Sequence, residues 1–301
     1  MSARETVRPL PAAVEAVETQ LSRVPRHPHA WLWWVAASQL AVMAIWLAWG
    51  WRAGLPALLV SHAFVLVPVF QPCSRVYAPV LARLPSSGRR VWLTIDDGPS
   101  DDTMAILDLL DRHAAKATFF LVGERAQARP GLVAAIVRRG HGIGNHSHTH
   151  PQAWFWALGP KRMRDEVLRA QQALTALCGQ PPRWFRSVVG MTNPFVAAPL
   201  RTAGLTRVAW SARGYDAVRA DPAQVVALIE RDLAPGAIVL LHEGAPHGRS
   251  VEMIGLLLQR LDALDFASVL PEELMAAPVA HDGSAAGAKE PVRSAALVDE
   301  R

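Results

Sequence analysis

Cysteine is almost absent from this chain of 301 residues, which contains only Cys73 and Cys178. Two cysteines cannot form the disulfide framework of a small secreted domain, and they cannot by themselves complete a zinc site. We interpret both as packed thiols, because free cysteine is among the residue types that are most often buried. Any metal site in this chain is therefore expected to use other ligands.

The chain also lacks a run of lysines and arginines interleaved with aromatic residues, and no internal repeat is visible. The formal net charge is +5, and the arginines are spread out, with some clustering beside the apolar N-terminal part. Nucleic-acid-binding proteins concentrate basic charge on one face or along one helix, whereas basic residues that flank an apolar segment are typical of membrane proteins. The charge distribution predicts a lipid bilayer as a partner, and no nucleic acid.

A long uncharged segment follows the polar residues 1–29. Residues 30–51, AWLWWVAASQLAVMAIWLAWGW, contain no charge and match the roughly 20 residues that cross a bilayer core. Tryptophans gather at both ends of the segment, where an aromatic belt places them. A buried core helix and a cleaved signal peptide are the alternatives, but the length of the run and its distance from Met1 favour a membrane span.

A second apolar run over residues 55–70 is shorter and contains His62 and Pro68. We expect a second span, so that residues 30–71 form a transmembrane hairpin; an interfacial segment is the alternative. The connecting loop has only Arg52, whereas the outer flanks carry Arg23, Arg26, Arg75, Arg83, Arg89 and Arg90. The positive-inside rule then places both termini in the cytoplasm, and the main domain changes sides if the second run does not span.

Strand and helix patterns alternate over residues 88–276, which we interpret as one α/β domain. The β-rich runs are VWLTI, ATFFLVG, GHGIGN, RWFRSVVG, TRVAWSA and GAIVLLH, and helical spacing of apolar residues lies between them, for example over residues 160–178. This alternation predicts a parallel sheet, open or closed into a barrel, with its chemistry at the C-terminal ends of the strands. Residues 277–301 are rich in Ala, Gly and charge, and we expect a disordered tail there.

Two of these strand ends carry groups that can hold a metal. Asp96 and Asp97 follow VWLTI, and adjacent carboxylates repel each other unless a cation or a proton shares the site; a turn or a helix cap is the alternative. In GNHSHTH, a helical turn would place His146 and His150 on one face, although a polar histidine-rich loop is the alternative. We expect His148 to point elsewhere. Together, one carboxylate and two imidazoles would leave positions open for water and substrate, as catalytic metal sites do.

Later segments add three more candidates. Arg186 lies in FRSVVG, Asp216 in WSARGYD and His242 in LLHEG. Each is ambiguous alone, because a histidine after an apolar strand is more often a satisfied core residue and an aspartate in a loop is usually a turn residue. Their order along the chain is more informative than any one of them.

That order resembles the NodB-type polysaccharide deacetylases of carbohydrate esterase family 4. The motifs TIDDGP, ATFFLVG, GHGIGNHSHTHP, FRSVVG, WSARGYD and LLHEG follow one another within residues 91–270. The resemblance implies an α/β fold, a distorted (β/α) barrel often built from seven strands, with a divalent ion that is commonly zinc. It also implies a hydrolase that removes N-acetyl or similar acyl groups from the amino sugars of a poly- or oligosaccharide.

The resemblance assigns a role to each candidate residue. The metal ligands would be Asp97, His146 and His150. The catalytic residues would be Asp96 as general base, Arg186 holding Asp96, His242 as general acid and Asp216 tuning His242. These roles suit amide hydrolysis, which needs an activated water and a proton for the departing amine, and we expect a backbone N–H near Val189 to hold the oxyanion.

One segment departs from the family pattern. Where the family often has Asp-x-x-Asp-Trp, this chain has Arg213, Gly214, Tyr215, Asp216 and Ala217. The missing tryptophan normally walls the acyl pocket, so a formyl group is an alternative to acetyl. A deformylase or deacetylase of a polyprenyl-linked sugar at the cytoplasmic face is the second functional hypothesis. A non-catalytic carbohydrate-binding relative is the third, and the intact set of candidate residues disfavours it.

Overall fold

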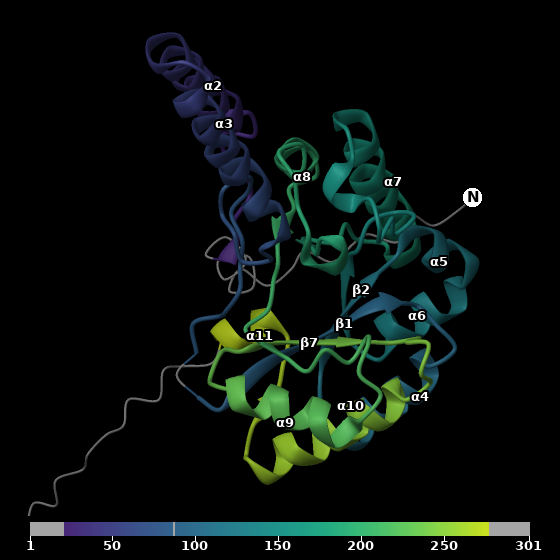
Figure 1. The fold of residues 1–301 in the computed structure, drawn as a ribbon. Helices are drawn as coiled ribbons and strands as arrows, with labels where there is room; N and C mark the ends of the chain where they lie inside the picture. The colour runs from purple at the N-terminus through teal and green to yellow at the C-terminus, as the bar shows by residue number, and fades with distance from the viewer. Residues whose placement is uncertain (1–20, 87, 277–301) are drawn as a thin grey trace, which may run out of the picture.

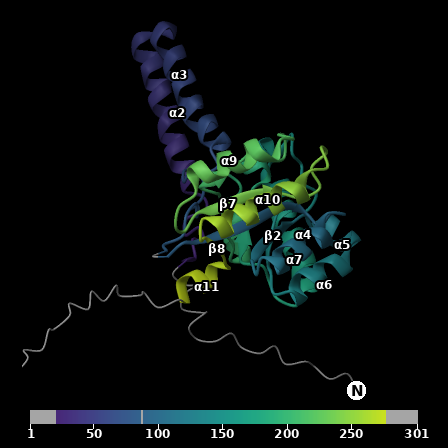
Figure 2. The same ribbon diagram turned by 90° about the horizontal axis from the view of Figure 1, so that it is seen from below.

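The computed structural model describes residues 21–86 and 88–276 (Figure 1). The first part of the predicted polar segment and the whole of the predicted disordered tail lie outside the described residues. Two long apolar helices project together from an α/β domain in both views (Figure 1, Figure 2). The described chain thus consists of a helical hairpin and a domain built around one parallel sheet.

The hairpin consists of α2 (Ala30–Trp49) and α3 (Trp51–Leu66), and the short 3-10 helix η1 (Val67–Phe70) follows directly. Gly50 alone separates the two helices, with a φ of 74° that favours glycine. The second apolar helix therefore begins at Trp51 rather than at residue 55, and Arg52 lies inside it rather than in a connecting loop. The helix α2, and α3 together with η1 over Trp51–Phe70, are each long and apolar enough to cross a membrane by length and composition.

The two helices pack closely and leave most of their surface open. A Cβ atom at Gly54 would lie 2.4 Å from the indole of Trp46, so a glycine is needed for the helices to approach. Ser61 also accepts a hydrogen bond from Gln39 Nε2 at 2.8 Å across the pair. In contrast, large apolar side chains on the outer surface are exposed, such as Trp33 at 81%. A buried core helix, which was one alternative, would not expose such side chains.

The domain contains an eight-stranded sheet in which every paired strand is parallel to its neighbour, as predicted. Its strand order is β5-β4-β3-β2-β1-β7-β6, and β8 pairs with β1. The strands are β1 (Arg90–Gly98), β2 (Ala117–Leu121), β3 (Gly142–Asn145), β4 (Trp184–Phe185), β5 (Thr206–Arg207), β6 (Ala212–Arg213), β7 (Ile238–His242) and β8 (Ala267–Ser268).

Helices alternate with these strands and cover the sheet (Figure 1). They are α4 (Thr103–Arg112), α5 (Gly123–Ala128), α6 (Pro130–Arg138), α7 (Pro160–Cys178), α8 (Ala197–Ala203), α9 (Pro222–Asp232), α10 (Ser250–Ala263) and α11 (Pro271–Ala276), with the 3-10 helices η2 (Phe155–Ala157) and η3 (Val188–Gly190). Local sequence sets several ends: Asp221 caps α9 by accepting the N–H of Ala223, and Gly179 ends α7 with a φ of 73°.

The sheet curls, and both faces of its central strand β1 are buried. Alternate residues of β1 pack outward against the surrounding helices, whereas Trp92 packs inward against Phe120 and Trp184. On the open side, isolated bridges join Leu81 to Val208 and Arg83 to Ala237. The result is the distorted (β/α) barrel that the family resemblance implied.

The parallel register brings the predicted strand ends to one edge. Asp96 on β1 lies opposite His242 on β7 and opposite Phe120 on β2. Asn145 at the end of β3 pairs with Phe185 at the end of β4. Because the next residues along the chain continue past the same edge, groups far apart in sequence meet there.

Candidate active site

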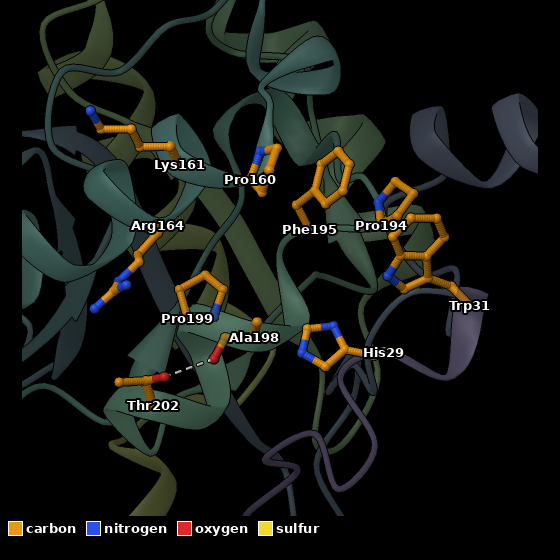
Figure 3. Close-up of a pocket in the computed structure, with 10 residues that line it drawn as sticks. All are labelled: His29, Trp31, Pro160, Lys161, Arg164, Pro194, Phe195, Ala198, Pro199 and Thr202. Atoms are coloured by element: carbon orange, nitrogen blue, oxygen red, sulfur yellow. Dashed lines mark hydrogen bonds between the residues drawn. The ribbon is translucent and has the colours of Figure 1, made fainter. Parts of the chain in front are cut away.

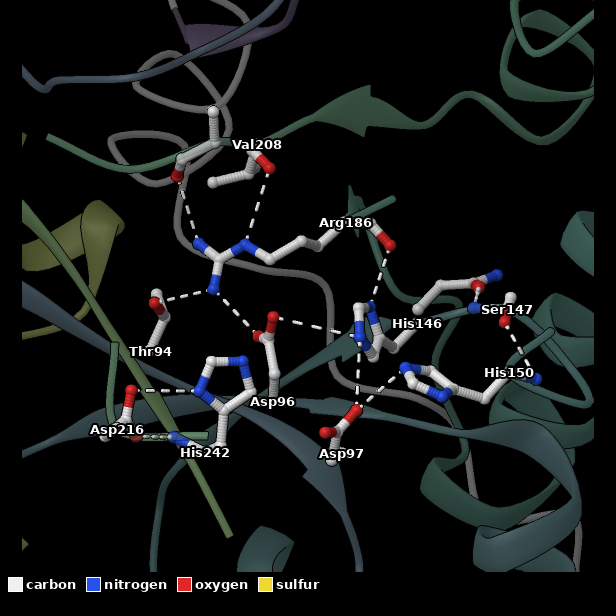
Figure 4. Close-up of polar contacts among 12 residues, drawn as sticks. Thr94, Asp96, Asp97, His146, Ser147, His150, Arg186, Val208, Asp216 and His242 are labelled. Carbon is white, nitrogen blue, oxygen red and sulfur yellow. Dashed lines mark hydrogen bonds and ion pairs between the residues drawn. The ribbon is translucent and has the colours of Figure 1, made fainter. Parts of the chain in front are cut away.

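A bulge at the end of β1 aims two neighbouring carboxylates into one site. Successive side chains of a regular strand point to opposite faces, but the register of β1 against β2 shifts between Asp96 and Gly98. Asp97 has a φ of 71° at this irregularity. Its Oδ1 atom lies 3.5 Å from His146 Nε2, and Asp96 Oδ2 lies 3.8 Å from the same nitrogen (Figure 4). The bulge therefore lets both carboxylates face one imidazole.

The two histidines come from a loop and not from a helical turn, so the predicted helical geometry was wrong. Residues 146–150 are not helical, and Ser147 and His150 have φ values of 68° and 55°. These left-handed residues fold the loop so that the His146 and His150 rings lie 5.0 Å apart. His148 instead lies near Glu124, with its Nε2 3.9 Å from Oε1.

The atoms of Asp97, His146 and His150 form a set that fits a divalent cation. One ligand atom from each residue lies within 4.8 Å of the others. His146 Nδ1 lies 2.8 Å from the carbonyl of Arg186 and donates to it, which leaves the lone pair of neutral Nε2 facing the carboxylates. Asp97 Oδ1 is buried and lies 2.9 Å from His150 Nε2, but no N–H of the described residues points at it in hydrogen-bond geometry. Two imidazole nitrogens and a carboxylate oxygen that face one another in this way are a donor set that can hold a divalent cation.

Electrostatics keep Asp97 in its ligand form. Burial alone raises the pKa of the Asp97 carboxyl, but His146 and His150 hold that pKa well below its usual range. Burial also lowers the pKa of His150, which favours the neutral imidazole that binds metals. Asp97 is therefore ionised, and burial disfavours the charged form of His150.

Arg186 fixes the carboxylate of Asp96. Its Nη1 donates to Asp96 Oδ1 at 2.8 Å and to Thr94 Oγ1 at 2.7 Å, and its Nη2 donates to the carbonyl of Ala209 at 3.0 Å. The guanidinium is fully buried and lies 4.2 Å from the ring centre of Phe120. With one oxygen of Asp96 bound, the other is left directed at the metal-ligand cluster (Figure 4).

His242 is paired with Asp216 on the opposite side of the site. Its Nδ1 lies 3.0 Å from Asp216 Oδ1, and its backbone N–H donates to Asp216 Oδ2 at 2.6 Å. Burial lowers the pKa of His242, but the charge and hydrogen bond of Asp216, with Asp96 and Asp97, outweigh it and raise the pKa to about 9. The imidazole is therefore protonated at neutral pH and can donate a proton from Nε2.

A cavity of about 140 Å³ opens between Asp96 and His242. Its other lining residues are Val189, Gly190, Trp210, Arg213, Tyr215, Asp216, Ala217, Val218 and Leu240. Ala217 lines the cavity where the family often has tryptophan, and Trp210 supplies an indole to the same cavity. Sequence reasoning missed Trp210, because its position after a short strand does not indicate that its side chain lines the cavity.

Sequence reasoning also missed two buried glutamates that hold the loops of the site. Glu166 on α7 accepts hydrogen bonds from the backbone N–H groups of His148 and Thr149, at 3.0 and 2.8 Å. Glu243 accepts from the Ser100 hydroxyl at 2.7 Å, just after the β1 bulge. Neither residue contacts the cavity, and their only signal in the sequence is a charge next to an apolar run.

Comparison with known proteins agrees with this arrangement. The family model for polysaccharide deacetylase matches residues 83–208. The chain is 39% identical over 165 residues to the chitooligosaccharide deacetylase of Bradyrhizobium sp. (strain ANU 289), covering 54% of this chain and 74% of the relative. It is 30% identical over 215 residues to the peptidoglycan-N-acetylglucosamine deacetylase of Listeria monocytogenes, covering 69% of this chain and 45% of that protein.

A solved structure shows the same fold. The family 4 carbohydrate esterase from Streptomyces lividans, in complex with acetate, superposes with a TM-score of 0.56 at 33% sequence identity. The match covers 62% of this chain and 96% of the esterase. The curated relatives are carbohydrate deacetylases, which hydrolyse carbon–nitrogen bonds, and the intact set of candidate residues disfavours the non-catalytic hypothesis. A pseudoenzyme of the same family from Bacillus anthracis, 26% identical with a TM-score of 0.59, is also among the similar structures. The chain belongs to the NodB-type polysaccharide deacetylases of carbohydrate esterase family 4.

Proposed function

We propose that this protein is a membrane-anchored, zinc-dependent deacetylase of N-acylated amino sugars. One observation carries the proposal. The cluster of Asp97, His146 and His150 lies beside Asp96, and the cavity separates Asp96 from the protonated His242. A metal site, a base and an acid thus surround one small cavity, as amide hydrolysis requires.

The residues around the cavity would each carry out one part of the hydrolysis. A divalent cation held by Asp97, His146 and His150 would lower the pKa of a bound water and polarise the acyl oxygen. Asp96, held by Arg186, accepts the proton of the water as it attacks the acyl carbon. The backbone N–H of Val189, which lines the same cavity as Asp96, would stabilise the oxyanion.

The second half of the reaction needs a proton for the departing nitrogen. His242 donates this proton as the carbon–nitrogen bond breaks, and Asp216 stabilises the imidazolium beforehand. The products are the free amine on the sugar and the carboxylic acid. Of the two ring nitrogens of His242, Asp216 contacts Nδ1, which leaves Nε2 free to reach the substrate.

The substrate is an N-acylated amino-sugar glycan or a lipid-linked sugar. The relatives are named for chitooligosaccharides and for peptidoglycan N-acetylglucosamine, so an N-acetylated glucosamine unit is the first substrate to test. The cavity volume of about 140 Å³ suits a small acyl group such as acetyl or formyl. Ala217, where the family often has tryptophan, leaves the choice between the two small groups to experiment.

A specific contact favours the second hypothesis, a polyprenyl-linked sugar at the membrane surface. The segment that leaves the apolar hairpin packs against the wall of the cavity. Val69 accepts the N–H of Thr192 at 2.9 Å, and Pro72 lies so close to Gly190 that an added Cβ would approach it to 2.7 Å. If α2 and α3 both span, the cavity opens near the bilayer on the cytoplasmic side, within reach of a lipid-linked substrate.

The metal and the base are tested with the full chain, since the hairpin segment is packed into the domain. Bound metal is measured by plasma mass spectrometry, and acetate or formate release is assayed with N-acetylglucosamine oligomers and with a polyprenyl-linked N-acylated sugar. We expect Asp96→Asn to keep the metal and lose turnover, whereas His146→Ala loses both. His113→Ala, at an exposed ion pair with Asp262, is the matched control and should change neither.

Two outcomes would contradict the assignment. Retention of metal at wild-type affinity by His146→Ala would remove His146 from the ligand set, and full activity of Asp96→Asn would remove Asp96 as the base. Reporter fusions after residues 50 and 88 test the anchor: two spans place them in opposite compartments, and a shared compartment would exclude the hairpin. The preferred substrate of the two follows from the ratio of their kcat/KM values.

A further inference from the structure

A second, larger cavity lies where the apolar hairpin meets the domain. It has a volume of about 450 Å³, within the range of roughly 300–1,000 Å³ that is typical of small-molecule sites. Its walls come from the start of α2, the start of α7 and the start of α8 (Figure 3). The lining residues are His29, Trp31, Pro160, Lys161, Arg164, Pro194, Phe195, Ala198, Pro199 and Thr202. We refer to these residues as the hairpin groove.

The hairpin groove is basic and has no acidic residue in its lining. Lys161 and Arg164 form no ion pair within the described part of the chain. Both lie in the first turns of α7, where the helix dipole is positive and the first turn has no acidic residue to offset it. Both side chains are exposed, so their charges and the positive end of the helix can together attract an anion.

The other wall of the hairpin groove is aromatic. Trp31 packs edge-on against Phe195, with ring centres 5.4 Å apart. In Figure 3, Trp31 and His29 lie on one side of the groove, and Lys161 and Arg164 lie on the other. Such a pairing of cations with aromatic rings suits a ligand that has both a negative charge and an apolar part.

The position of the groove points to the source of that ligand. Trp31 lies in the first turn of α2, directly before a run of exposed apolar side chains that includes Trp33. When α2 is inserted in a bilayer, its first turn lies at the level of the lipid headgroups, where tryptophan is enriched. The groove would then face the phosphates of the bilayer and not the bulk solvent.

We propose that the hairpin groove binds the phosphate of an anionic phospholipid of the phosphatidylglycerol type. Lys161 and Arg164 bind the phosphate, and Trp31 and Phe195 contact the glycerol and the first part of the acyl chains. This rests on the membrane insertion of α2 proposed above, and it is independent of the deacetylase chemistry. The bound lipid would hold the domain in one orientation, since Pro194 and Phe195 continue the chain that lines the catalytic cavity at Val189.

Native mass spectrometry of the detergent-solubilised full chain tests this proposal. The protein is mixed with 1-palmitoyl-2-oleoyl-phosphatidylglycerol or with the matching phosphatidylcholine, and the retained lipid is counted after release from the micelle. We expect a preference for phosphatidylglycerol that the double variant Lys161→Ala/Arg164→Ala loses. A cation near anionic lipid contributes about 5-fold in affinity, so the pair predicts a loss of about 25-fold.

The matched control is the double variant Arg112→Ala/Arg138→Ala, which removes two exposed cations from α4 and α6, away from the hairpin (Figure 1). It should keep the preference. Equal retention of the two lipids by the wild type, or an unchanged preference in Lys161→Ala/Arg164→Ala, would overturn the proposal. Displacement of phosphatidylglycerol by millimolar inorganic phosphate alone would also overturn it, because the groove would then be a site for free phosphate.

Activity separates this proposal from the proposed function. Lys161→Ala/Arg164→Ala should deacetylate soluble N-acetylglucosamine oligomers at the wild-type rate, which also shows that the variant is folded. Loss of that activity together with loss of lipid would indicate a damaged domain, and the proposal would fail. If the wild type proves inactive on sugars, the lipid preference still stands or falls by the mass spectra alone.

Discussion

Replacing Asp216 by asparagine removes a buried negative charge from His242 and keeps the size of the side chain. The asparagine carbonyl can still accept the backbone N–H that Asp216 Oδ2 accepts at 2.6 Å. The variant therefore changes mainly the charge beside the imidazole. Because Asp216 is the first of the groups that raise the pKa of His242 to about 9, its loss should lower that pKa markedly.

The size of the effect follows from the two pKa values. A general acid must be protonated, so kcat/KM falls as the pH rises through the pKa of His242 in the free enzyme. In the variant, burial and the remaining charges of Asp96 and Asp97 oppose each other, so we take the ordinary value of about 6.5. The protonated fraction at about pH 8 then falls from about 0.9 to about 0.03, a loss of about 30-fold, whereas little is lost at about pH 6.

The assay is the pH profile of kcat/KM on an N-acetylated oligosaccharide, with Asp108→Asn on exposed α4 as control. Stability gives a second readout. Because the folded pKa of His242 lies above its unfolded value, the pair stabilises the fold fully below about pH 6.5, by roughly 3 kcal/mol, and that contribution is lost as the pH rises through about 9. Urea unfolding of Asp216→Asn should show no such loss. An unchanged alkaline limb in Asp216→Asn would refute the assignment of His242 as the acid.

Three further predictions concern stability and the metal. Arg186→Met leaves the buried carboxylate of Asp96 without its cation, and urea unfolding should show a loss of about 3–5 kcal/mol; a loss below about 1 kcal/mol would contradict the pairing. Gly190→Ala places a Cβ 2.6 Å from Trp210 at a φ of 75°, so the free energy of unfolding should fall by about 1–3 kcal/mol. An unchanged Tm would contradict this prediction and show that Trp210 can move aside without cost. Chelation of divalent ions should abolish acyl release and lower Tm, and zinc should restore both, because a ligand of the native state stabilises it. A Tm that does not change on chelation would argue against a bound ion.

The meeting of the candidate residues could be expected from the sequence, because it depends on topology. Alternating strands and helices predict a parallel sheet, and the C-terminal ends of parallel strands share one edge. Asp96, His146, Arg186 and His242 each end or follow such a strand, so their proximity needs no knowledge of the loops. This is why the metal-ligand cluster could be named before its geometry was known.

The details of the loops could not be expected, because they depend on backbone conformations that residue types disfavour. Sequence patterns gave no sign that Val189 would adopt a φ of 46°, since left-handed backbone is rare for β-branched residues. RWFRSVVG reads as one strand, yet only Trp184–Phe185 is extended, and Val188–Gly190 forms a 3-10 turn. The packing of Pro72 against this turn depends on tertiary contacts alone.

The backbone conformations explain why buried carboxylates surround the site. Five of the seven non-glycine residues with positive φ in the described part of the chain line or flank it, namely Asp97, Ser147, His150, Val189 and Tyr215. Each such residue costs on the order of 1–3 kcal/mol, and together they approach the whole stability of a typical domain, about 5–15 kcal/mol.

Local preference therefore cannot hold these loops, and long-range contacts must do so. Glu166 binds two N–H groups of the histidine loop from α7, and Glu243 binds the turn after β1 from the end of β7. Burial raises the pKa of Glu243, and its hydrogen bonds to Thr103 and Ser100 oppose this rise. A carboxylate that is buried at such a cost is best explained by what it positions. Here it positions the strand ends that carry the proposed metal ligands and the proposed base.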